Sequence, residues 1–181
     1  MFNNNADWAE FYRDVEEELP PKTPEPRGKD VSIYSFVNDN HAVNVVTRGS
    51  HNGIIMFIQN SPIICFSKKQ NTVETATFGN ELVALRICKD LIFVLRYKLR
   101  IFCVRLERPA YFFCDNSGVV NNMSIPESVL HKKQNEINHH SVCEAVAEDI
   151  LKIGKEYGET NLADLLAKVV DGIDVRNQYF L

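Results

Sequence analysis

The longest regular pattern of apolar residues lies in the middle of the chain. Seven residues recur at steps of three and four, so they share one face of a helix: Phe78, Leu82, Leu85, Cys88, Ile92, Leu95 and Leu99. Thr75 or Thr77 can cap the start of this helix with a side-chain oxygen. The pattern predicts a long amphipathic helix whose apolar stripe faces a core.

Three extended runs of apolar residues precede this helix. The first covers residues 31–37 and alternates partly between apolar and polar positions. The second and third cover residues 53–59 and 62–67, and Asn60 and Ser61 separate them in front of a proline. Asn, Ser and Pro favour tight turns. The second and third runs are therefore predicted to pair as an antiparallel hairpin.

After the long helix, strand and helix patterns alternate. We expect a strand at 110–114, a turn at 115–118, a helix at 141–148, a strand at 150–153, a loop at 154–160 and a terminal helix at 161–170. Strands that alternate with helices favour parallel pairing. The sequence therefore predicts an α/β fold with a mixed five-stranded sheet. Its first three strands are antiparallel, its last strands are parallel, and helices flank it.

The first 29 residues differ from the rest of the chain. A short amphipathic segment around Trp8 and Tyr12 is followed by four prolines within residues 20–26, which favour extended chain. Residues 1–30 hold eight acidic and four basic residues, and their net charge of −4 equals that of the whole chain. We predict an acidic, proline-rich leader or linker at 1–29, a domain at 30–170 and a tail at 171–181.

Composition narrows the class of protein. With 181 residues, of which 45% are hydrophobic, the chain can bury a core as one domain. No apolar run is long enough for a membrane helix, and the N-terminus does not resemble a secretory signal. Its five cysteines form no CxxC pair, which favours reduced, buried thiols. We expect an intracellular protein, cytoplasmic or nuclear, without a membrane partner.

Basic residues gather between Arg86 and Arg108, where seven bases accompany only two acids. Residues 31–181 are neutral overall, so any binding of nucleic acid requires a local basic patch. A run of this density is also typical of a solvated helix face. The sequence leaves both interpretations open.

Three carboxylates stand at positions that suit chemistry. Glu81 lies in the first turns of the long helix, Asp115 ends a strand at the edge where α/β sheets bind ligands, and Asp164 begins the last helix. Each also has a simpler interpretation as a helix-start charge or a turn residue. Together they are expected to converge on one sheet edge, where cations must neutralise them. Oxygen ligands suit Mg²⁺ or Mn²⁺, and a pair of such ions can hydrolyse a phosphodiester.

Several stretches resemble a known family in order and spacing. They include FVNDNHA (36–42), FCDNSGVV (113–120) and ETNLADLLAK (159–168). From about residue 30 to 170 the chain resembles the ribonuclease H domain of copia-type retrotransposon Pol polyproteins. The leader resembles the segment that links the reverse transcriptase to that domain. The resemblance implies the ribonuclease H fold, cleavage of the RNA strand of an RNA–DNA hybrid with two Mg²⁺ or Mn²⁺ ions, and a reverse transcriptase as a partner.

The resemblance also assigns the catalytic positions. Glu81, Asp115 and Asp164 fall on three of the family's metal-binding carboxylates, and the first aspartate of the family is replaced by Asn38. A neutral amide cannot bridge two cations as a carboxylate does, so we expect impaired cleavage that Asn38→Asp restores. Neighbouring side chains of a strand point to opposite faces. Substitution by Asp39 is therefore expected to need a one-residue slip or a bulge.

Contacts to the hybrid backbone are also implied by the resemblance. They involve Asn116, Lys132, Lys133, His140, Arg86 and Lys89. Other positions depart from the family: Gly49 and Cys143 replace arginines, and Cys65 replaces a tryptophan and is expected to leave a smaller core side chain. The alternative hypothesis is a non-catalytic ribonuclease H-like module, degenerate or recruited, that binds nucleic acid or protein.

Overall fold

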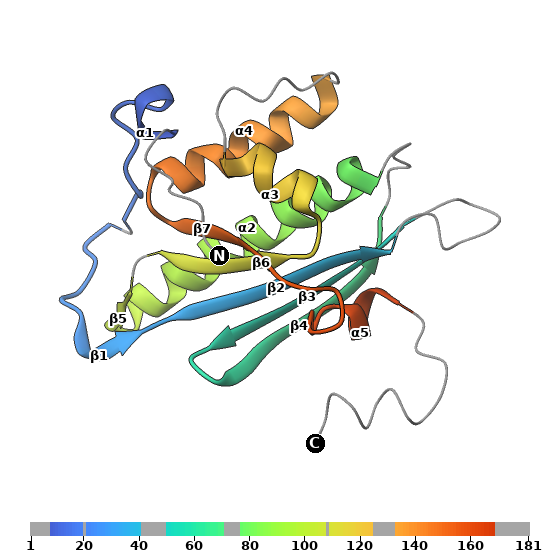
Figure 1. Ribbon diagram of the computed structural model, residues 1–181. Helices are drawn as coiled ribbons and strands as arrows, with labels where there is room; N and C mark the ends of the chain where they lie inside the picture. Colours follow the sequence, from blue (N-terminus) through green and yellow to red (C-terminus); the bar gives the residue numbers. More distant parts are fainter. Residues whose placement is uncertain are drawn as a thin grey trace.

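A twisted five-stranded sheet forms the centre of the computed structural model, with strand order β4-β3-β2-β6-β7 (Figure 1). The strands are β2 (Ile33–Asn40), β3 (His51–Ile58), β4 (Ser61–Lys69), β6 (Ala110–Cys114) and β7 (Leu151–Lys155). The structure describes residues 8–19, 21–40, 50–70, 77–107, 109–124 and 133–168. β2, β3 and β4 form an antiparallel meander, whereas β6 pairs with β2 and β7 pairs with β6 in parallel. The predicted fold class is therefore confirmed.

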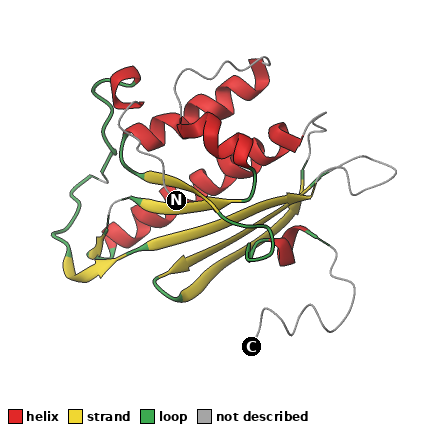
Figure 2. Cartoon of the chain, viewed as in Figure 1, coloured by secondary structure: helices red, strands yellow, loops and turns green. Residues whose placement is uncertain are grey.

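Helices gather on one face of this sheet (Figure 2). They are α2 (Thr77–Ile101), α3 (Ser117–Ser124) and α4 (Lys133–Ala147). The short helix α5 (Asp164–Ala167) lies on the other face, because a side chain at Gly53 would point away from the core and meet the backbone of α5. None of the described helices is both long and apolar enough to cross a bilayer.

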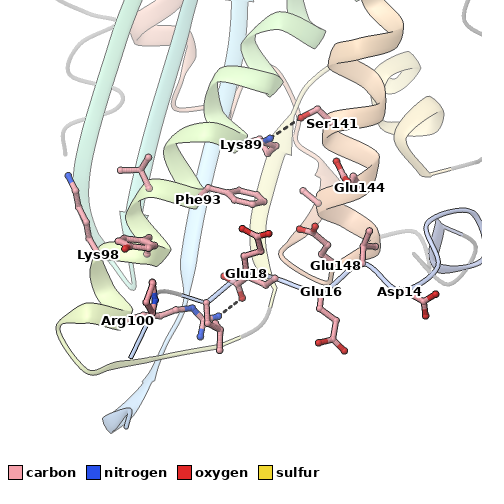
Figure 3. A pocket seen from close by; sticks show the side chains of 17 residues that line it. Asp14, Glu16, Glu18, Lys89, Phe93, Lys98, Arg100, Ser141, Glu144 and Glu148 are labelled. Atoms are coloured by element: carbon pink, nitrogen blue, oxygen red, sulfur yellow. Dashed lines mark hydrogen bonds and ion pairs between the residues drawn. The ribbon is translucent and has the colours of Figure 1, made fainter. Parts of the chain in front are cut away.

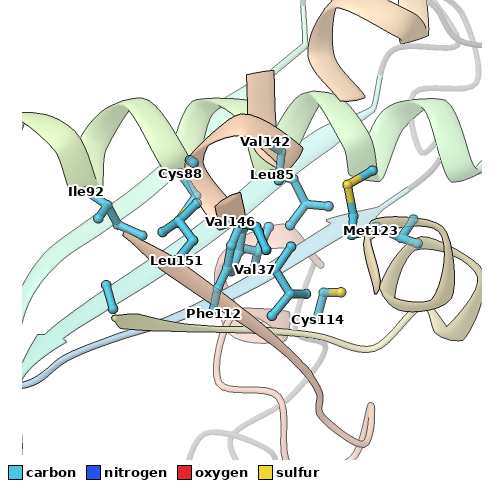
Figure 4. Close-up of a cluster of buried hydrophobic side chains, with 14 of the residues drawn as sticks. Val37, Leu85, Cys88, Ile92, Phe112, Cys114, Met123, Val142, Val146 and Leu151 are labelled. Carbon is cyan, nitrogen blue, oxygen red and sulfur yellow. The ribbon is translucent and has the colours of Figure 1, made fainter. Parts of the chain in front are cut away.

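The apolar stripe predicted for the long helix does face the core. Leu82, Leu85, Cys88 and Ile92 of α2 are fully buried. They belong to one cluster with side chains from the strands, from α3 and from α4 (Figure 4). Burial of this stripe, rather than helix propensity, holds a 25-residue helix straight across the sheet.

Some local predictions were wrong. The expected turn at 115–118 runs directly into α3, because the Oδ1 of Asn116 accepts hydrogen bonds from the backbone N–H groups of Gly118 (2.8 Å) and Val119 (3.3 Å) and so caps that helix. Within the described residues the terminal helix is a single turn, α5. A two-stranded ribbon of β1 (Arg27–Val31) and β5 (Val104–Leu106) was not predicted.

The cysteines are free thiols, and three of them, Cys88, Cys114 and Cys143, are buried as predicted. Cys103 is half-buried and Cys65 is exposed on β4. The expectation that Cys65 leaves a gap in the core was therefore wrong, because its side chain lies outside the core. Gly49 lies outside the described residues.

The leader packs on the helices instead of extending into solvent. Trp8, in α1 (Trp8–Phe11), is buried and its Nε1 donates a hydrogen bond to the backbone oxygen of Met123 at 2.6 Å. Further along, Glu17 forms an ion pair with Arg96 at 2.9 Å and a second with Arg100. Two of the basic residues on α2 therefore bind the leader. The boundary between leader and domain at residue 29 stays a prediction.

Candidate active site

Parallel pairing of β2 and β6 brings their carboxyl ends to the same edge of the sheet. Phe36 is the register partner of Phe113. Continuing this register by two residues sets Asn38 beside Asp115, which directly follows β6. Strands that pair lie about 4.8 Å apart, so the ends of β2 and β6 form one narrow edge.

Glu81 reaches this edge from the second turn of α2. Its side chain is buried, and its Oε2 has no hydrogen-bond partner. Burial and the charges of Asp115 and Asp39 raise the pKa of Glu81 to about 8, although a hydrogen bond from Asn116 opposes the rise. Asn116 thus orients Glu81 by donating a hydrogen bond to its carboxylate, while the Oδ1 of Asn116 caps α3.

Asp39 lies on the same side of the sheet as Glu81. It is only 6% exposed, and neither carboxylate oxygen has a hydrogen-bond partner. Burial and the charge of Asp115 raise the pKa of Asp39 to about 7. The register between β2 and β3 is continuous here, with Asp39 opposite Asn52, so no slip or bulge is needed to bring Asp39 close to Asp115 and Glu81.

Asn38 points to the opposite face of β2 and is also buried. Its Oδ1 accepts a hydrogen bond from the backbone N–H of Asp39 at 2.7 Å, and its Nδ2 has no partner. The side-chain oxygen of Asn38 is therefore engaged by the backbone.

Asp164 reaches the same edge from the face that carries α5. Asn161 fixes the preceding loop, because its Nδ2 donates to the backbone oxygen of Val37 at 2.9 Å. Asp164 forms an ion pair with Lys168 at 2.5 Å. Burial and the charge of Asp164 raise the pKa of Asp115, whereas Lys168 lowers it. Asp115 thus stands between the carboxylates of the two faces.

A hollow of about 550 Å³ opens beside Asp164 and is lined by Tyr157, Gly158, Glu159, Asp164 and Lys168. A side chain at Gly158 would lie 3.6 Å from the Oδ2 of Asp115. Asp115 therefore borders this hollow, which leaves the edge of the sheet accessible from the side of α5.

The carboxylate oxygens at this edge are ligands of the chemical type that a hard divalent cation binds. Both carboxylate oxygens of Asp39 and the Oε2 of Glu81 lack a proton donor, and oxygen ligands are those that Mg²⁺ and Mn²⁺ prefer. In the part of the chain that the structure describes, no three His, Cys, Asp or Glu side chains stand close enough together to hold an ion as they are. A cation would have to draw these side chains inward.

The residues predicted to contact the hybrid are spread more widely. Arg86 pairs with Asp90 on the exposed side of α2, and the Nζ of Lys89 lies 2.8 Å from the Oγ of Ser141. Lys89 lines a groove of about 890 Å³ between the leader, α2 and α4 (Figure 3).

The remaining predicted contacts fall in two groups. His140 contacts the hydroxyl of Tyr12 in the leader at 2.5 Å. Lys132 and the side chain of Lys133 lie outside what the structure describes. Asn116 alone among the described residues of this set lies beside the carboxylates, and the assignment of the whole set stays a prediction.

Sequence reasoning missed Asn161 and Gly53 as residues that position the site. A glycine inside an apolar strand is a recognised signal of close backbone approach, and here it makes room for α5. An added Cβ at Gly53 would overlap the carbonyl oxygen of Ala163 and approach the backbone nitrogen of Ala167 to 2.7 Å. Asn161 carried no comparable local signal.

Solved structures with this arrangement identify the fold. Ribonuclease H1 of the archaeon Halobacterium salinarum superposes with a TM-score of 0.58 at 12% identity, covering 75% of this chain and 94% of that one. The N-terminal ribonuclease H domain of a Mycobacterium tuberculosis protein gives 0.57 at 16% identity, covering 82% and 98%. The chain has the ribonuclease H-like fold.

Two further comparisons find similarity to retroelement and viral proteins. The Retrovirus-related Pol polyprotein from transposon RE1 of Arabidopsis thaliana is 25% identical over 142 residues, which is 78% of this chain and 10% of that polyprotein. The chain therefore spans about a tenth of this curated relative. A foamy viral protease–reverse transcriptase, solved in complex with an RNA/DNA hybrid, superposes with a TM-score of 0.50 at 15% identity, covering 85% and 22%. No family model matches the sequence.

Proposed function

We propose that this ribonuclease H-like domain of retrotransposon Pol type cleaves the RNA strand of RNA–DNA hybrids with divalent cations, at a rate lowered by Asn38. The observation that carries the proposal is the convergence of Glu81, Asp115 and Asp164 at one edge of the sheet, where Asp115 raises the pKa of Glu81 and Asp164 raises the pKa of Asp115. The foamy viral structure with the same fold holds an RNA/DNA hybrid, which supports this substrate and a reverse transcriptase as partner.

The roles of the side chains follow from their positions. Glu81 and Asp115 would hold a cation on the side of α2, and Asp115 and Asp164 would hold one on the side of α5. Bound Mg²⁺ or Mn²⁺ supplies positive charge that activates water and stabilises the leaving oxygen of a phosphodiester. Asn116 keeps Glu81 oriented, and the hollow beside Asp164 admits a phosphate of the backbone.

A non-catalytic module is the second candidate, and two observations favour it. Asn38 carries no charge, and its oxygen is engaged by the backbone N–H of Asp39. Lys168 already neutralises Asp164, so the side of α5 attracts a cation less strongly. Such a module would still bind a hybrid through its shape and 2′-hydroxyl groups.

Cleavage of an end-labelled RNA–DNA hybrid in Mg²⁺ or Mn²⁺ separates the two candidates. We expect slow cleavage by the unchanged chain and at least a roughly tenfold gain in Asn38→Asp, because a shared carboxylate stabilises the transition state by more than about 1.4 kcal/mol. Asp115→Asn is the inactive control, and a DNA duplex is the control substrate. Tight hybrid binding without cleavage in both the unchanged chain and Asn38→Asp would favour the non-catalytic module.

A further inference from the structure

The face of the sheet to which each residue of β2 points decides which side chain can meet a cation beside α2. Ser35, Val37 and Asp39 alternate with Phe36 and Asn38, so the first three share one face. Ser35 and Val37 are buried on that face, and the Ser35 side chain lies near the thiol of Cys88 of α2. Asp39 therefore belongs to the face of α2, from which Glu81 also comes.

The surroundings of Asp39 lack the partners that a buried carboxylate requires. Its two oxygens are buried and accept no hydrogen bond from any described residue. Glu81 has one such oxygen as well. An isolated, ionised, buried carboxylate costs several kcal/mol, and proteins offset this cost with a cation, with hydrogen-bond donors or by keeping a proton on the carboxyl. Two carboxylates in this condition, whose electrostatic influence on each other and on Asp115 shows that they are neighbours, supply the oxygen ligands that a divalent cation binds once it draws them together.

Asn38 is unsuited to this task for a different reason. It lies on the other face of β2, opposite Gly53 and therefore towards α5. Its oxygen is engaged by the backbone and its buried Nδ2 repels a cation. Asn38 therefore faces the half of the site beside α5, whereas Asp39 faces the half beside α2.

We propose that Asp39, together with Glu81 and Asp115, binds a single divalent cation on the side of α2, and that this chain uses Asp39 where residue 38 is neutral. The inference rests on the proposed function, since it assigns the ligands of that same site. Asn38, Asp115 and Asp164 form the other half of the site, on the side of α5. This half lacks one negative charge, which Asn38→Asp would supply.

The test is a titration of the purified full chain with Mn²⁺ alone, followed by electron paramagnetic resonance and calorimetry. The unchanged chain is expected to bind one Mn²⁺, and Asp39→Asn is expected to weaken that binding at least tenfold. Asp149→Asn is the matched control, because it removes the same charge from an exposed turn that precedes β7, at the opposite edge of the sheet. Its affinity should stay within twofold of the unchanged chain.

A measurement without substitution guards against a variant that does not fold. Substoichiometric Mn²⁺ broadens the nuclear magnetic resonance signals of nearby amides, and we expect the strongest broadening at Asp39, Glu81 and Asn116. Broadening centred on Gly158 and Asp164 instead would overturn the inference.

The outcomes separate this inference from the proposed function. Equal Mn²⁺ affinity in Asp39→Asn and the unchanged chain, with loss in Asp164→Asn, would overturn the role of Asp39 and leave the nuclease proposal intact. Absence of any Mn²⁺ binding at millimolar concentration, together with no cleavage of the hybrid, would overturn both.

Discussion

The two ends of α2 treat buried carboxylates in opposite ways. Near the C-terminal end, Glu17 of the leader lies between Arg96 and Arg100 and is fully paired. Near the N-terminal end, Glu81 and Asp39 are equally buried, yet three of their four oxygens have no partner. About 22 Å of helix separates Glu81 from Arg96.

This contrast separates a structural acid, Glu17, from Glu81 and Asp39, for which we propose a functional role. A paired buried carboxylate locks a segment in place, and Figure 3 shows the leader lying at the groove between α2 and α4. Unpaired carboxylates destabilise the fold unless a cation arrives. For carboxylates, burial together with the absence of a partner is the observation that supports the proposed role of Glu81 and Asp39.

The largest expected effect on stability comes from removing the ion pairs of Glu17 at the C-terminal end of α2. Glu17→Gln leaves Arg96, which is 1% exposed, without a counter-charge and should lower the free energy of unfolding by about 3–5 kcal/mol. Chemical denaturation followed by circular dichroism measures this loss. Glu16→Gln, at an exposed neighbouring position, is the control and should change stability by less than about 0.5 kcal/mol. Equal effects of the two variants would show that the ion pair does not hold the leader.

The pH dependence of stability tests the unpaired carboxylates, Asp39 and Glu81, near the N-terminal end of α2. The pKa values of Asp39 and Glu81 are raised to about 7 and about 8 in the folded chain, so the folded state keeps protons that the unfolded state loses above about pH 4. The contribution of these groups is therefore complete below pH 4 and lost as pH rises to 8. Without metal, stability should fall by on the order of 2–4 kcal/mol between pH 5 and 8.

Thermal melting between pH 5 and 8, with and without Mn²⁺, measures this pH dependence of stability. Mn²⁺ should flatten the profile, because it stabilises the ionised carboxylates of the folded chain. A metal-free profile that is flat or rises with pH would contradict the assignment of unpaired acids at this end.

The smallest expected effect has the opposite sign from that of Glu17→Gln. Glu81→Gln removes a buried charge that lacks a cation and should raise the metal-free stability at pH 8 by about 1–2 kcal/mol. The same substitution should abolish Mn²⁺-dependent cleavage of the hybrid. Denaturation at pH 8 measures the first effect, and a loss of stability there would place Glu81 among the structural acids.

The five strands of the main sheet and the long helix α2 could be predicted in order from the sequence, because apolar periodicity specifies them. The stripe on α2 and the hairpin of β3 and β4 follow directly from the spacing of their residues. The positions of Glu81, Asp115 and Asp164 at one edge followed from strand order and helix starts. Their catalytic roles stay a prediction.

Other features depend on long-range contacts that no local pattern announces. The basic run was interpreted as a solvated face or a phosphate patch, yet Arg96 and Arg100 bind a glutamate about 80 residues away in sequence. Asp39 was expected on the wrong face for the site. The alternation was correct, but the sequence alone did not show that Glu81 approaches from that same face.

The missing side chain of Gly53 has a practical consequence for surveys of related genomes. Because α5 packs against Gly53 of β3, the carboxylate of Asp164 on α5 keeps its position only while residue 53 has no Cβ. A search for intact copies among many decayed retroelement fragments can therefore score this inconspicuous strand glycine alongside the acids themselves. Copies that carry a larger residue there would be sorted as inactive before any protein is made.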